Sequence, residues 1–135
     1  MEADLAQTAR AYFEMVDEKS AHGTGANRPI DLVHLAKQTF GERDLEAELL
    51  RLFDRQSTQI LAHLAGHDMT ESRVKADIAH TLKGSARAIG AFGVASAAEE
   101  YESAATRGED DKPAFERLGQ AVAAAHEAIV ELLAN

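Results

Sequence analysis

The residue with the clearest capacity for chemistry is His80, which lies in a stretch of helical periodicity between Thr70 and Ile89. At about 100° per residue, the side chains expected to face a core cluster within roughly 40° of one direction. They are Val74, Ile78, Leu82, Ser85 and Ile89. His80 lies roughly 160° from that direction, so we expect its imidazole to face solvent. A neutral imidazole is nucleophilic near physiological pH, since its unperturbed pKa is about 6.5.

The surroundings of His80 fit an imidazole that a second protein must approach. Ala76 and Gly84 lie one turn before and after it, and a mid-helix glycine costs up to about 1 kcal/mol relative to alanine. Small residues at both positions would let another surface come close to the ring. Three cations share this side of the helix: Lys83, Arg73 and Arg87. They would stabilise a dianionic group on the ring and attract an acidic partner, although a solvated basic stripe is the alternative interpretation.

An exposed histidine, a nearby cation and a bare approach surface are sufficient for a phosphoryl carrier. The imidazole nitrogen can attack phosphorus in line and hold the group as a phosphoramidate. Such transfer needs mainly positioning and charge neutralisation. The sequence contains no P-loop, no kinase signature and no Gly-rich strand–helix turn, so we expect no intrinsic ATP-dependent kinase activity.

The sequence around His80 resembles that of histidine phosphotransfer (HPt) domains. The resemblance rests on the segment AHTLKGS at 79–85 and on Gly90, Val94 and Glu102. It implies that His80 is phosphorylated, that Lys83 lies beside the phosphoryl group, and that Gly84 makes room for the partner. Some members carry a glutamine that hydrogen-bonds near the ring, at the position where this chain has Glu102.

The resemblance also implies a set of partners. HPt domains exchange phosphoryl groups with aspartates of response-regulator receiver domains and work with hybrid histidine kinases. We therefore expect a phosphorelay carrier rather than a turnover enzyme. It should need no cofactor of its own, because Mg²⁺ belongs to the receiver domain.

The apolar periodicity predicts the elements that position these residues. We expect long helices at about 44–65, 70–90, 92–106 and 113–133, and N-terminal helices at about 4–19 and 31–41, the latter capped by Asp31. Thr70 should cap the helix of His80, and Pro113 suits a first helical turn. The prediction is an all-α protein, an antiparallel up-down four-helix bundle with additional N-terminal helices. Residues 1–135 would be one domain, with a helix and connector at 1–29 and the bundle at 30–135.

Composition narrows the remaining function classes. The formal net charge of -9 opposes general binding to nucleic acid or anionic membranes. The absence of cysteine excludes disulfides and a thiolate zinc site. No apolar run approaches the roughly 18 residues of a membrane span, and the acidic, polar N-terminus is unlike a signal peptide. We expect a cytoplasmic, monomeric protein.

Other candidate residues carry weaker signals. His63 and His67 have the spacing of a zinc chelate, but Gly66 interrupts the helix and no third ligand is evident, so we expect no metal site. Leu50 and Leu61 lie about 100° or more off the main apolar stripe of their helix. We interpret them either as a second set of core contacts or as part of a docking surface for a response regulator. We expect the isolated His22, His34 and His126 to be structural or solvated.

Two other functions compete with the carrier. The first alternative is an HPt-type phospho-accepting domain of a larger hybrid or chemotaxis-type kinase, which would share the pattern around His80. That kinase would need attached dimerisation and ATP-binding domains, which this sequence does not contain. A non-catalytic helical adaptor would instead tolerate loss of His80.

Overall fold

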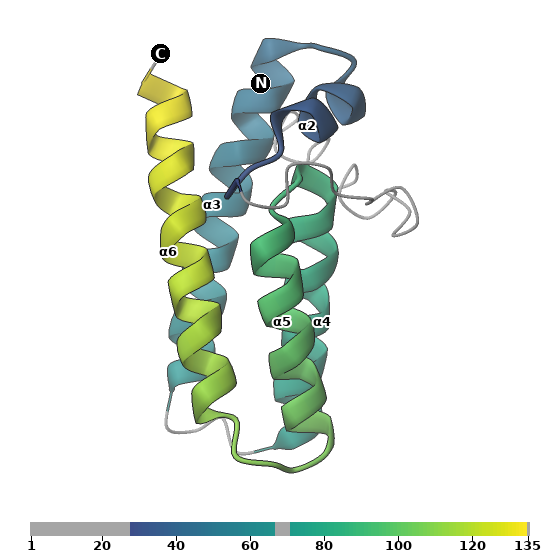
Figure 1. Ribbon diagram of the computed structural model, residues 1–135, viewed down its shortest axis with the longest axis vertical. Helices are drawn as coiled ribbons and strands as arrows, with labels where there is room; N and C mark the ends of the chain where they lie inside the picture. The colour runs from purple at the N-terminus through teal and green to yellow at the C-terminus, as the bar shows by residue number, and fades with distance from the viewer. Residues whose placement is uncertain (1–27, 67–70, 135) are drawn as a thin grey trace.

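The computed structural model describes residues 28–66 and 71–134, which form five α-helices and no strand. The short α2 (Leu32–Thr39) precedes four long helices: α3 (Arg43–Ala65), α4 (Ser72–Ile89), α5 (Phe92–Thr106) and α6 (Lys112–Ala134). Figure 1 shows the long helices side by side, with successive helices running in opposite directions. Each of the four packs against two neighbours, since α3 also contacts α6. The predicted all-α up-down bundle is therefore confirmed.

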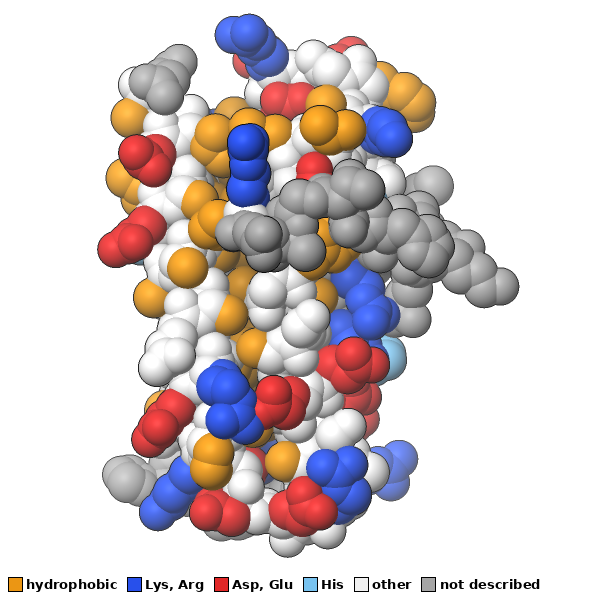
Figure 2. Space-filling model, in the orientation of Figure 1, with side chains coloured by type: hydrophobic (Ala, Val, Ile, Leu, Met, Phe, Trp, Pro, Cys, Tyr) orange, Lys and Arg blue, Asp and Glu red, His pale blue; other side chains and the backbone are white. Residues whose placement is uncertain are grey.

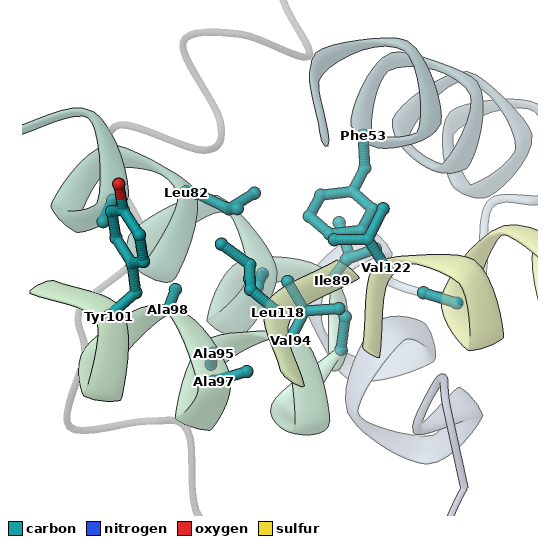
Figure 3. Packing of buried hydrophobic residues seen from close by; sticks show 14 of the residues in the cluster. Phe53, Leu82, Ile89, Val94, Ala95, Ala97, Ala98, Tyr101, Leu118 and Val122 are labelled. Carbon is teal, nitrogen blue, oxygen red and sulfur yellow. The ribbon is translucent and has the colours of Figure 1, made fainter. Parts of the chain in front are cut away.

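The core lies along the centre of this bundle and combines large aliphatic and aromatic side chains with many alanines. Phe53 of α3, Leu82 of α4 and Leu118 of α6 are fully buried, and they converge in the bundle interior (Figure 3). Burial of one such side chain stabilises the fold by about 1.5–3 kcal/mol. The face that α5 contributes is mostly alanine, and these small side chains allow its neighbours to approach closely.

The buried face of α4 is broader than the predicted stripe and is rotated toward α5. Leu82, Ser85 and Ile89 are buried as predicted, and Ile78 is half-buried. The prediction that Val74 lies inside is wrong, because its side chain is exposed in the first turn of α4. Buried residues Ala79, Lys83 and Ala86 instead extend the face on the other side. The cause is that α4 packs most extensively against the alanine-rich α5.

Gly90 ends α4 and also contacts the segment that leads into α2. Its φ of 83° is in the left-handed region that favours glycine. The backbone N–H of Asp31 donates to the Gly90 carbonyl at 2.9 Å. A Cβ on Gly90 would lie 2.8 Å from the Asp31 carbonyl oxygen. The Asp31 side chain also caps α2, accepting from the His34 N–H at 3.0 Å, as predicted.

The bounds of α5 are those predicted, and the boundaries of the other described helices differ from the predicted ones by at most two residues. The N-caps of α3 and α4 are Glu42 and Glu71, and neither side chain makes a capping hydrogen bond. The predicted helix at 4–19, the predicted cap Thr70 and the candidate ligand His67 lie outside the described residues. Among the helices of the described residues, none is long and apolar enough to cross a membrane.

Candidate functional site

His80 lies on the outer side of α4, with 57% of its side chain exposed. The predicted outward orientation of this imidazole is confirmed. Its Nδ1 atom is 3.0 Å from Oε2 of Glu102, which projects from α5. The antiparallel pairing of α4 and α5 explains this contact. The two helices join at Gly90 and Ala91, and His80 and Glu102 lie ten residues before and twelve residues after Gly90.

Lys83 completes a three-residue cluster by binding the same carboxylate. Its Nζ donates to Oε1 of Glu102 at 3.0 Å. Only 10% of the Lys83 side chain is exposed, so the prediction that it lies on the same outer side of the helix as His80 is wrong. Lys83 faces the α4–α5 seam because the buried side of α4 is rotated toward α5. Its long aliphatic stem fills that seam, and its ammonium ends on Glu102.

The Glu102 carboxylate is ionised and determines which nitrogen of His80 carries a proton. Desolvation by burial raises the pKa of Glu102, but the hydrogen bond and positive charge of Lys83, together with His80, outweigh it, so the pKa lies below its ordinary value. An ionised carboxylate only accepts hydrogen bonds. The Nδ1 atom of His80 must therefore carry the hydrogen that it shares with Glu102. In the neutral ring, the lone pair is then on Nε2, the atom available to an electrophile.

Gly84 leaves open space one turn after His80. A Cβ built on Gly84 would meet no heavy atom within 4 Å outside its own helix. The glycine is therefore not required by packing within the protein. This absence of contacts agrees with the expectation that Gly84 clears a path to the imidazole.

The predicted basic patch is largely a set of ion pairs. Lys83 is paired with Glu102, and Arg87 lies 3.9 Å from Glu99 of α5. Arg73 is exposed in the first turn of α4. Sequence reasoning did not identify Glu99, although it lies on the same helix as Glu102 and three residues before it. The positive charge of the predicted basic patch is therefore partly neutralised by the carboxylates of Glu102 and Glu99.

Two candidate partner-binding residues belong to the core instead. Ala76 is buried on the α4 face that packs inside the bundle, so it does not flank His80 on the surface. Leu50 is 4% exposed and is part of the core cluster, so it is unsuited to docking. Leu61 is half-buried and packs against the same cluster. The interpretation of Leu50 and Leu61 as second core contacts, rather than a docking surface, fits these positions.

The other described histidines have distinct environments. His34 is buried and packs edge-on against Phe92, with ring centroids 5.1 Å apart. His63 is exposed in the last turn of α3. His126 is not isolated, because its Nδ1 lies 2.7 Å from Oδ1 of Asp54. In residues 28–66 and 71–134, no three His, Asp or Glu side chains are grouped to hold a metal ion.

A comparison with models of known protein families gives a match over most of the bundle. The family model described as "Hpt domain" matches residues 48–131, from the first third of α3 to near the end of α6. No curated protein and no solved structure matched the chain.

Proposed function

The chain belongs to the Hpt domain family and so takes part in histidine phosphotransfer in a phosphorelay, and from this premise we propose that His80 carries the phosphoryl group. The observation that supports the proposal is the contact between Nδ1 of His80 and Glu102 at 3.0 Å, on a side chain that is 57% exposed. An oriented nucleophile that also faces solvent is what a carrier requires.

In this proposal, the lone pair on Nε2 of His80 attacks the phosphorus of a receiver-domain aspartyl phosphate. The new bond joins Nε2 to phosphorus, and the bond from phosphorus to the aspartate oxygen breaks. The aspartate leaves as a carboxylate, and the imidazole becomes a phosphorylated cation with its proton still on Nδ1. Glu102 stabilises that cation by charge and hydrogen bonding.

The reverse reaction uses the same contacts. A receiver aspartate attacks phosphorus, the bond from phosphorus to Nε2 breaks, and neutral imidazole leaves. Neutral imidazole is a good leaving group only if Nδ1 remains protonated, which Glu102 favours. Lys83 acts through Glu102, because its ammonium fixes the carboxylate at 3.0 Å and keeps it ionised. Lys83 is thus a positioning residue in this scheme and has no acid–base role.

Hpt domains generally interact with receiver domains and kinases. We propose that a receiver domain, alone or in a hybrid histidine kinase, is the direct partner of this chain. Its acidic pocket would supply the aspartate and Mg²⁺, and Gly84 would give it access to the imidazole. We also propose that residues 1–135 form one domain, with the predicted helix and connector at 1–29 and the bundle at 30–135, and that it works in the cytoplasm as a phosphorelay intermediate.

Chemical stability of the phosphorylated protein tests the proposal. The protein is incubated with a radiolabelled phospho-receiver domain, purified, and exposed to acid or alkali. A phosphoramidate on His80 should be lost in acid and retained in alkali, and peptide mapping should place the label on 72–89. Label that survives acid and is lost in alkali would indicate an acyl phosphate and contradict the histidine assignment.

A further inference from the structure

A second imidazole–carboxylate pair lies on the other side of the bundle. Nδ1 of His126, on α6, is 2.7 Å from Oδ1 of Asp54, on α3. His80 and Glu102 bridge the α4–α5 seam, whereas His126 and Asp54 bridge the α3–α6 seam. The two pairs therefore share no helix.

The two histidines are closely matched in their local chemistry. The His126 side chain is 53% exposed, nearly the same as that of His80, and the Asp54 side chain is largely covered. A carboxylate partner accepts hydrogen bonds, so Nδ1 of His126 carries the shared hydrogen when Asp54 is ionised. In the neutral ring, the lone pair is then on Nε2, directed away from Asp54. The carboxylate also stabilises, by charge and hydrogen bonding, the cation that forms when Nε2 is modified.

We propose that His126 is a second phosphoryl-accepting residue, activated by Asp54 and served by small phosphoryl donors rather than by receiver domains. Access distinguishes it from His80. Val130 occupies the position four residues after His126 that Gly84 occupies after His80, and it is 52% exposed. A branched side chain beside the ring obstructs a protein surface, whereas a phosphoramidate or acyl phosphate molecule can pass it.

Phosphoramidate can transfer its phosphoryl group to His126 without any further reactant. Nε2 of His126 attacks phosphorus, the bond from phosphorus to the donor nitrogen breaks, and ammonia leaves. The product is a phosphorylated imidazolium with its proton on Nδ1, held by Asp54. Loss of that proton to solvent gives the neutral phosphoramidate.

His63 provides an internal control because it is also an exposed histidine, but no ion pair to a carboxylate is found for it among the described residues.

The intact protein carrying His80→Ala is treated with potassium phosphoramidate. The rate at each histidine is followed by peptide mass spectrometry, and the modified nitrogen by ¹H–¹⁵N correlation spectra. We expect His126 to react at least threefold faster than His63 and only at Nε2, while His63 gives both isomers.

Two further variants, in the same His80→Ala background, separate the proposal from simple exposure. Asp54→Asn should lower the rate at His126 to that of His63 and allow both nitrogens to react, while circular dichroism shows an unchanged helix content. Val130→Gly should leave the phosphoramidate rate unchanged. Equal rates at His126 and His63, or an unchanged rate in Asp54→Asn, would overturn the proposal. Neither result bears on His80, which is absent from these variants.

Discussion

At the scale of single residues, Glu102 connects the two groups that define the site. One of its oxygens accepts from His80, and the other accepts from Lys83, each at 3.0 Å. It thereby fixes the orientation and tautomer of the imidazole, and Lys83 keeps it ionised. The resemblance to HPt domains already indicated Glu102 as a residue near the ring. The burial of Lys83 could not be predicted, because a helical wheel assigned this lysine to the polar side of α4.

Replacement of Glu102 by glutamine should slow phosphotransfer while the bundle stays folded. The amide of glutamine can either accept from Nδ1 or donate to it, so the tautomer of His80 is no longer fixed. We expect the rate of acceptance from a phospho-receiver domain to fall about tenfold or more, by analogy with the loss when the partner that orients a metal-ligating imidazole is mutated. Rapid-quench transfer assays measure this rate, with Glu100→Gln on the same helix as a control. An unchanged rate in Glu102→Gln would contradict the positioning role.

The same carboxylate should make stability depend on pH. Because the pKa of Glu102 is lowered in the folded protein, its ionised form contributes stability above its ordinary pKa, near 4.5. That contribution is lost as the pH falls through the lower, folded-state value. The difference in unfolding free energy between wild type and Glu102→Gln should therefore be largest near neutral pH and shrink below about pH 4.5. Urea unfolding at a series of pH values measures it. A difference independent of pH would show that Glu102 is not held ionised.

Gly84 is expected to matter for access and not for folding. Gly84→Gln should slow acceptance from a receiver domain at least tenfold, because the long side chain lies beside the imidazole. It should not lower stability, since a Cβ there meets nothing within 4 Å outside its own helix and glutamine is a better helix former than glycine. Gly119→Gln on α6, which is equally unobstructed, is the matched control. Normal transfer by Gly84→Gln would contradict the clearance argument.

At the scale of elements, the antiparallel α4–α5 hairpin builds the site. Its connection at Gly90 and Ala91 sets the register that brings His80 opposite Glu102. Apolar periodicity predicted all four long helices and their order, because leucine, isoleucine and phenylalanine mark the core clearly. It misjudged the buried side of α4, because alanine carries little weight in such patterns. Ala76, Ala79 and Ala86 are core residues, and only their packing against another alanine-rich helix reveals it.

Gly90 should be the most sensitive glycine in this hairpin. A Cβ at a φ of 83° is strained by about 1–2 kcal/mol. It would also meet the Asp31 carbonyl oxygen at 2.8 Å, a backbone contact that can relax only if the segment before α2 shifts. We expect Gly90→Ala to lower the unfolding free energy by about 2–4 kcal/mol. Gly108→Ala, with a φ of 66° and no neighbour within 4 Å, isolates the strain alone. Equal losses for the two variants would show that the Asp31 contact is unimportant.

At the scale of the whole molecule, the helices enclose a buried core, and the histidine–carboxylate pairs lie on the outer surface, each between two neighbouring helices. Charged side chains of both signs are interspersed over the lower ends of α5 and α6 (Figure 2), where Arg117 of α6 pairs with Glu100 of α5. The site residue His80 is exposed, whereas the residues that hold the helices together are buried. Loss of the imidazole should therefore leave the fold intact and change the unfolding free energy by less than about 0.5 kcal/mol.

Transfer of radiolabelled phosphate from a phosphorylated receiver domain, with Mg²⁺ present, tests the central claim most directly. Wild type, His80→Ala and His126→Ala are compared, and circular dichroism confirms equal helix content. Wild type and His126→Ala should take up label at the same rate, and His80→Ala should take up none. Label on His80→Ala at the wild-type rate would show that His80 is not the carrier and would contradict the account.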